Sequence, residues 1–140
     1  MKYLKLSPYC LTLFIFNLLT IYPARSQSVA DIQTIQNAPL EITAPYTTLS
    51  SAYPAVVTLQ INEPALLSVS APFPNGFDDP SGTQRSSLLQ YNGESAVAGD
   101  TLSFNSIGIM EVEVDIQVIR PQPYSPGIYR YDVLLTVIPQ

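Results

Sequence analysis

The sequence predicts an all-β protein, an immunoglobulin-like antiparallel β-sandwich of about seven strands preceded by a signal peptide. Two observations carry this prediction. Short alternating or β-branched runs recur along the chain between clusters of turn-forming residues. Thirteen prolines among 140 residues disfavour long helices and suit loops and strand edges. Short strands at such spacing are typical of a sandwich, and a small closed antiparallel barrel is the alternative.

Residues 1–26 match the pattern of a secretory signal peptide. Lysines precede a mostly apolar run at residues 10–22, and Ala24 and Ser26 provide the small side chains that a cleavage site requires. We therefore expect cleavage before Gln27. An uncleaved membrane anchor is the alternative, although the apolar run is short for a membrane span.

Residues 27–44 carry a mixed pattern, and we expect an N-terminal extension that ends in a short strand. The sandwich domain is predicted to span residues 45–140. Its first hairpin combines a β-branched strand at residues 56–61 with a returning strand at residues 66–70, joined by a turn that contains Pro64.

The middle of the chain alternates between loop and strand signals. Residues 71–85 are rich in proline and glycine and predict a long surface loop. Short strands are expected at residues 86–91 and 101–104, with a tight turn at Asn92-Gly93.

Residues 110–140 show the strongest strand pattern. Large apolar residues alternate with polar ones in two stretches separated by the proline-rich segment 121–127, and a side-chain period of two is the strand period. We expect a long antiparallel hairpin whose apolar face needs a second sheet to cover it, because an isolated hairpin is marginally stable. The apolar positions are Met110, Val112, Val114, Ile116 and Val118 in the first stretch, and Tyr129, Tyr131, Val133, Leu135 and Val137 in the second.

The composition after residue 26 excludes several classes of function. This part lacks histidine, cysteine and lysine, and it retains Arg85, Arg120 and Arg130 against eleven carboxylates. Such an acidic chain is unsuited to bind nucleic acid or an anionic membrane, since both require cationic contacts. The missing histidine and thiol remove Ser-His and Cys-His catalysis and histidine-zinc sites. We therefore expect a secreted protein, periplasmic or at the cell surface, that is not an enzyme and uses no cofactor.

Paired carboxylates are one remaining chemical possibility. Glu111, Glu113 and Asp115 share one face of a predicted strand, with the Cβ atoms of alternate residues about 7 Å apart. Glycosidases place two carboxylates in that range, so an acid-active hydrolase is one hypothesis. A solvated outer face that discourages the stacking of exposed sheets explains the same pattern, and we favour this interpretation.

The loop at residues 71–85 offers a candidate calcium site. Asp78 and Asp79 bring carboxylate oxygens, which calcium prefers, to a flexible turn, although a metal-free acidic turn is the simpler interpretation. Loop aromatics can stack on sugars, or they can cover the ends of the core. These aromatics are Tyr46, Tyr53, Phe73, Phe77 and Tyr124. Both features define an alternative function, a secreted carbohydrate- or calcium-dependent binding module.

Residues 125–139 resemble the last strand of the spore coat protein U family, secreted pilin-like subunits related to the major subunits of archaic chaperone–usher fimbriae. That strand reads Gly-x-Tyr-x-Asp/Tyr-x-Val-x-Val-Thr-Val, and comparable places here hold Gly127, Tyr129, Tyr131, Val133, Thr136 and Val137. The resemblance implies an incomplete immunoglobulin-like domain, a periplasmic chaperone that binds the last strand, and self-assembly with sister subunits at the surface.

These observations lead to one functional hypothesis. We expect an exported, non-enzymatic structural or adhesive surface subunit that assembles through β-strand contacts. The strand presented to a periplasmic chaperone or a sister subunit would be formed by Tyr129, Tyr131, Val133, Leu135 and Val137. Apolar residues alternate poorly over residues 29–42, so a role of the N-terminal extension as donor strand stays open.

Overall fold

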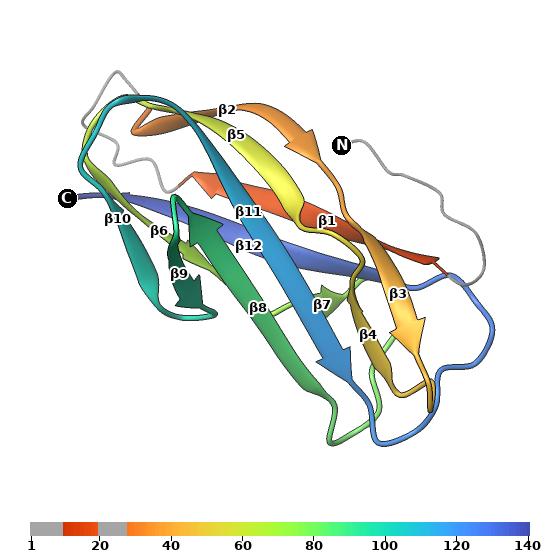
Figure 1. Cartoon of the computed structure of the whole chain (residues 1–140). Helices are drawn as coiled ribbons and strands as arrows, with labels where there is room; N and C mark the ends of the chain where they lie inside the picture. Colours follow the sequence, from red (N-terminus) through yellow and green to blue (C-terminus); the bar gives the residue numbers. More distant parts are fainter. Residues whose placement is uncertain (1–9, 20–27) are drawn as a thin grey trace.

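The structure is a computed structural model that describes residues 10–19 and 28–140, and this part of the chain is all-β and contains no helix, as the sequence predicts (Figure 1). The strands are β1 (Cys10–Leu19), β2 (Ala30–Gln36), β3 (Pro39–Thr43), β4 (Thr48–Ser51), β5 (Ala55–Ile61), β6 (Ala65–Val69), β7 (Phe73–Pro74), β8 (Gln84–Tyr91), β9 (Glu94–Val97), β10 (Thr101–Phe104), β11 (Gly108–Ile119) and β12 (Arg130–Pro139).

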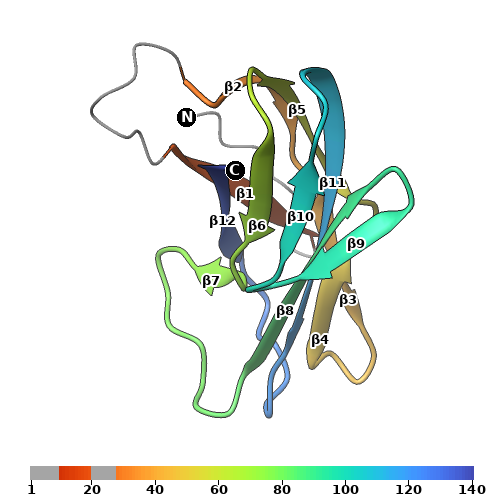
Figure 2. The ribbon, with the colours of Figure 1, turned by 90° about the vertical axis from the view of Figure 1, so that its left-hand side faces the viewer.

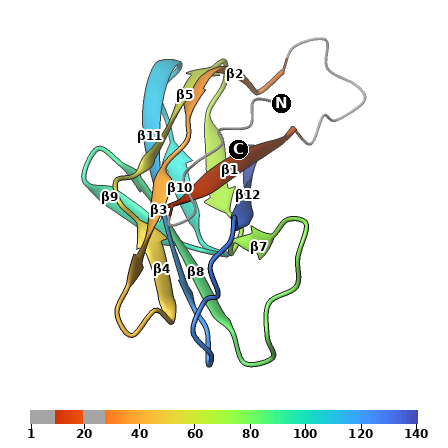
Figure 3. The same cartoon turned by 90° about the vertical axis from the view of Figure 1, so that its right-hand side faces the viewer.

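The strands after β1 form two antiparallel sheets that pack face to face. The larger sheet has seven strands, β2, β3, β4, β5, β8, β9 and β11, and the smaller has four, β6, β7, β10 and β12. Figures 2 and 3 show the two layers from the sides, with β11 and β8 in one layer and β12 and β6 in the other. This arrangement confirms the predicted β-sandwich.

Strand β11 is the centre of the larger sheet. Its first half pairs with β5 and its second half with β8 and β4. Glu113 and Val114 pair with both β5 and β8, so these two strands lie on opposite edges of β11. Alternate side chains from Met110 to Val118 are buried, whereas Glu111 and Glu113 are exposed. The period of two therefore separates a core face from an acidic outer face, as predicted.

Strand β12 is the centre of the smaller sheet. One of its edges pairs with β6 over residues 135–139 and with β7 at residues 131–132. The residues that face the core, none of them more than 2% exposed, are Tyr131, Val133, Leu135 and Val137. They meet the buried side chains of β11 and β5 in one hydrophobic core between the two sheets.

The two strongest strands do not form the hairpin that the sequence predicts. β11 and β12 belong to different sheets, and residues 120–129 cross from one sheet to the other. The same correction applies to β5 and β6, which the sequence joins as a hairpin but which pair with β11 and β12 respectively. Two strands that each bear an apolar face can cover one another across the core of a sandwich, and alternation does not distinguish this arrangement from side-by-side pairing.

The residues predicted as an N-terminal extension are part of the larger sheet. β2 pairs with β5 and β3 pairs with β4, while Ala30, Ala38 and Leu40 are buried. A register shift in β2 between Ile32 and Thr34 interrupts the alternation that would have indicated a strand. The sandwich therefore includes residues upstream of the predicted domain boundary.

Strand β1 lies between the two sheets and connects them. It runs parallel to β12, with eight Cα partners from Thr12↔Arg130 to Leu19↔Val137, and antiparallel to β3. β1 belongs to the segment that the sequence predicts to be a signal peptide. The other residues of that segment, and the predicted cleavage site before Gln27, lie outside the described residues.

Candidate functional site

The candidate functional site is the place between β12 and β3 that β1 occupies, called here the β1 position (Figure 3). Residues 130–137 of β12 pair across this edge, and residues 39–41 of β3 pair on the other side. Without β1, this edge of β12 has no strand beside it among the described residues. The β1 position is therefore a place for one extended strand, and the strand seen there comes from a segment that export is predicted to remove.

The residues predicted for partner binding line the β1 position or lie next to it. Four of them are on β12 with buried side chains: Tyr131, Val133, Leu135 and Val137. The fifth, Tyr129, precedes β12 and donates a hydrogen bond from its hydroxyl to the backbone carbonyl of Ser125 at 2.7 Å. Tyr129 therefore belongs to the loop before the strand.

Asp132 departs from the alternation of β12. Its neighbours Tyr131 and Val133 face the core, so Asp132 lies on the outer face, yet it is only 5% exposed. Its Oδ2 accepts a hydrogen bond from Asn75 Nδ2 at 2.8 Å, whereas its buried Oδ1 accepts none from the described residues. Burial raises the pKa of Asp132, and the Asn75 hydrogen bond and the charge of Arg130 offset this only in part.

A second buried carboxylate, Asp79, lies at one end of the sandwich, in the loop between β7 and β8. Its side chain is 0% exposed. Its Oδ1 accepts hydrogen bonds from Arg120 at 2.8 Å and from the Tyr131 hydroxyl at 2.6 Å, and its Oδ2 accepts one from Arg85 at 2.8 Å. Burial alone would raise the pKa of Asp79, but these hydrogen bonds and the charge of Arg120 hold it below its usual value. The cluster holds the long loop against β12.

Aromatic rings surround the guanidinium of Arg120. Its Cζ lies 3.9 Å from the ring centroid of Tyr124, 5.0 Å from that of Tyr129 and 5.4 Å from that of Phe77. The hydroxyls of Tyr124 and Tyr131 are 3.1 Å apart, and burial raises the pKa of Tyr124 to about 12. Two of the predicted loop aromatics thus cover one end of the core. The other three are exposed: Tyr46, Tyr53 and Phe73.

The candidate calcium residues have different surroundings. Asp79 faces Arg85 and Arg120, whose charges oppose the binding of a cation, and Asp78 is exposed. The part of the chain that the structure describes holds no group of three or more acidic, histidine or cysteine side chains arranged around a possible metal. The geometry therefore favours a loop-anchoring role for Asp79.

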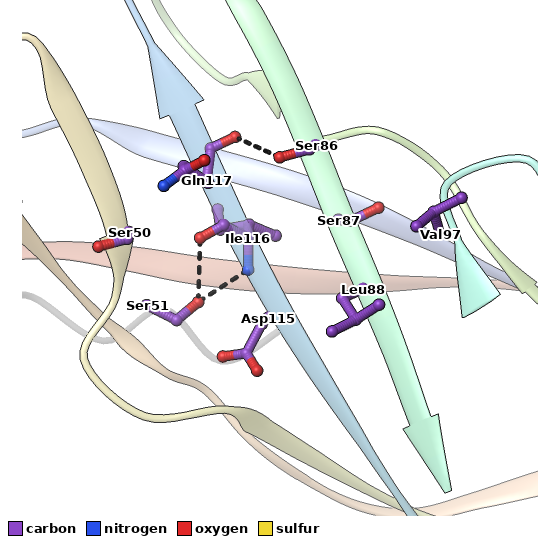
Figure 4. A pocket seen from close by; sticks show the side chains of 9 residues that line it. All are labelled: Ser50, Ser51, Ser86, Ser87, Leu88, Val97, Asp115, Ile116 and Gln117. Atoms are coloured by element: carbon purple, nitrogen blue, oxygen red, sulfur yellow. Dashed lines mark hydrogen bonds between the residues drawn. The ribbon is translucent and has the colours of Figure 1, made fainter. Parts of the chain in front are cut away.

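The acidic face of β11 borders a surface hollow of about 370 Å³ between β4, β8, β9 and β11 (Figure 4). Asp115 is the one acid in its described lining, and burial together with the charge of Glu113 raises the pKa of Asp115. The Ser51 hydroxyl accepts a hydrogen bond from the Ile116 amide at 2.9 Å, so it completes the sheet where β4 ends. Glu113 is exposed on the same outer face and lies outside the described lining of the hollow.

Sequence reasoning missed three parts of this site. The apolar run at residues 10–19 indicated a signal peptide and gave no hint of a strand beside β12. Asp79 and Arg120 are 41 positions apart, and no local pattern links them. Asp132 did leave a signal, because it is the one acid of β12 and lies between the large apolar residues Tyr131 and Val133, where a buried carboxylate needs a partner.

No known protein-family model matches this chain, and no curated protein matches its sequence significantly. The described residues contain no helix that is long and apolar enough to cross a membrane.

Proposed function

We propose that this protein is an exported, non-enzymatic structural or adhesive surface subunit that assembles with other chains through β-strand contacts. One observation carries the proposal. A segment predicted to be removed on export fills the place of a strand beside β12. Once that segment is removed, an extended segment of another chain takes the β1 position.

An unpaired β12 edge next to the core favours strand addition. Residues 130–137 would expose backbone N–H and C=O groups along this edge, and the core beneath would lose a covering strand. A strand from a partner satisfies both needs, since its main chain supplies hydrogen bonds and its alternate side chains enter the core.

The register describes the partner's segment. Four of its positions pair with core-facing residues of β12 and therefore call for apolar side chains. In the predicted signal peptide these four positions hold Leu13, Ile15, Asn17 and Leu19. The partner's strand runs parallel to β12 if it follows the direction of β1.

The resemblance of residues 125–139 to the spore coat protein U family supports the same proposal, because it implies a periplasmic chaperone that binds the last strand, followed by sister subunits. Residues 30–43 are already held within this sandwich as β2 and β3. They are therefore not free to act as the donor strand for a neighbour, and the donor comes from another segment.

The test compares two forms of the protein. One form is collected after export, and mass spectrometry establishes whether it starts at Gln27; the other is purified from the cell with residues 1–26 retained. Calorimetry then measures binding of a lysine-flanked peptide of residues 10–19, with a scrambled peptide as control, and light scattering measures assembly. We expect the processed form to bind the peptide and the unprocessed form not to. A processed form that stays monomeric and binds no peptide contradicts the proposal.

A further inference from the structure

We propose that Asp132 makes the β1 position selective for a partner strand that carries a hydrogen-bond donor, a lysine above all, at the position beside it. This inference rests on the proposed function and adds the chemistry of the partner's strand. It follows from the register at Asp132, the unmet hydrogen bonding of its carboxylate and the charges around it.

The register places one residue of any strand in the β1 position next to Asp132. The Cα partner of Asp132 is residue 14 of β1. Side chains of paired residues leave the sheet on the same face, about 5 Å apart. An incoming strand in the same register therefore brings one side chain within reach of the Asp132 carboxylate.

The carboxylate of Asp132 is satisfied on one flank only. Asn75, which donates to Oδ2, follows β7, and β7 pairs with the edge of β12 opposite to β1. The other oxygen, Oδ1, is buried and accepts no hydrogen bond from the described residues. Buried polar atoms without a partner are rare in folded proteins and point to a donor from elsewhere. The β1 position is the flank from which that donor can come.

Burial disfavours the charged form of Asp132 more than its neighbours favour it, so its pKa is raised. Arg130 lies two residues away on the same strand, and its charge lowers the pKa of Asp132. Asn75 acts in the same direction, but burial outweighs both. A cation brought by the partner would compensate the carboxylate at close range, and a carboxylate brought by the partner would be repelled.

The register position opposite Asp132 in the predicted signal peptide holds no such donor. The residue there is Phe14, and a phenylalanine side chain has no hydrogen-bonding group. The residue type at this register position therefore cannot meet the requirement of the carboxylate. A partner strand with a donor at this position would hold the β1 position more tightly than the peptide that the chain itself carries.

The first experiment tests the pairing within the full chain. Phe14→Lys is compared with Phe16→Lys, a matched control whose position pairs with Leu134 on the same face. Each is made with and without Asp132→Asn. We expect the folding equilibrium constant of Phe14→Lys to exceed that of Phe16→Lys about tenfold at neutral pH, and the excess to shrink with Asp132→Asn, which keeps an acceptor oxygen but loses the charge. Equal constants for the two lysine variants overturn the inference. If a lysine prevents folding, Phe14→Thr is compared with Phe16→Thr in the same way, because threonine also carries a hydrogen-bond donor.

The second experiment separates this inference from the proposed function. The processed protein is titrated with peptides of residues 10–19 that carry Lys, Phe or Glu at position 14. We expect affinity to fall in that order, and the differences to shrink with Asp132→Asn. Peptides that bind equally well overturn the inference and leave the proposed function intact. If none binds, the proposed function fails, and the full-chain comparison still decides whether Asp132 selects a donor.

Discussion

Asp79 and Asp132 are two buried carboxylates of one small protein with opposite surroundings. Asp79 receives hydrogen bonds from two arginines and a tyrosine, and its pKa is lowered. Asp132 receives one from Asn75, keeps a buried oxygen without a donor, and has a raised pKa. The chain thus completes its own hydrogen bonding at the end of the sandwich. On β12, the strand that borders the β1 position, the hydrogen bonding of the buried carboxylate stays incomplete.

The largest effect on stability is expected from the removal of the Asp79 carboxylate. Asp79→Ala leaves Arg120, whose side chain is 8% exposed, buried without its counter-charge. We expect the free energy of unfolding in urea to fall by about 3–5 kcal/mol, the usual loss when one partner of a buried ion pair is removed. Asp78→Ala, at the exposed neighbour, should change it by less than about 0.5 kcal/mol. Similar losses for the two variants would contradict an anchoring role for Asp79.

A smaller effect is expected from the hydroxyl of Tyr131. Tyr131→Phe keeps the buried ring but removes the donor to Asp79 and the contact with the Tyr124 hydroxyl. We expect a loss of about 1–3 kcal/mol in the free energy of unfolding, the range for a buried hydrogen bond to a charged group. The matched control is Tyr46→Phe, because the Tyr46 ring is 58% exposed. A control that loses as much as Tyr131→Phe would show that the cluster is not anchored through this hydroxyl.

The smallest effect concerns the pH dependence of stability. The folded pKa of Asp79 is lowered, so its stabilisation is present above the unfolded pKa and lost as pH falls through the folded pKa. The folded pKa of Asp132 is raised, so its contribution is present below the unfolded pKa and lost as pH rises through the folded pKa. We therefore expect Asp132→Asn to match the original chain at about pH 3, below the unfolded pKa, and to exceed its stability by about 1 kcal/mol at pH 7.

Urea denaturation of both chains between about pH 3 and 7 measures this difference, relative to an unfolded Asp pKa of about 3.9. Asp79→Asn provides the opposite control, since its deficit should grow as pH rises. Parallel curves for Asp132→Asn and the original chain would show that the Asp132 carboxylate is compensated within the chain.

The sequence predicted the sandwich because alternation reports directly which side chains are buried, as β11 shows. It did not predict which strands pair, because β11 and β12 would alternate in the same way in a hairpin or across a core. β2 was not predicted as a strand because its register shift between Ile32 and Thr34 interrupts the alternation of apolar and polar residues. The Asp79–Arg120 pair depends on how two loops fold over the end of the sandwich, which no local pattern contains.

The β1 position could not be predicted from the sequence for a different reason. The same apolar run satisfies the requirements of a signal peptide and those of a strand beside β12, so composition alone indicates only the first. The core-facing residues of β12 were identified correctly from their period of two. The place beside them became visible only through the pairing of residues 12–19 with residues 130–137.

Hydrogen exchange of the monomeric fraction of the processed protein, with and without the peptide of residues 10–19, tests most directly whether the β1 position accepts a strand. Those backbone amides of residues 130–137 that point toward the β1 position, and not toward β6 or β7, should exchange rapidly alone and slow down when the peptide is added. Amides in the first half of β11 should not change, since they pair with β5. If these amides of β12 are equally protected in the monomer without the peptide, or unaffected by it, no strand is accepted there and the proposed assembly through β12 is wrong.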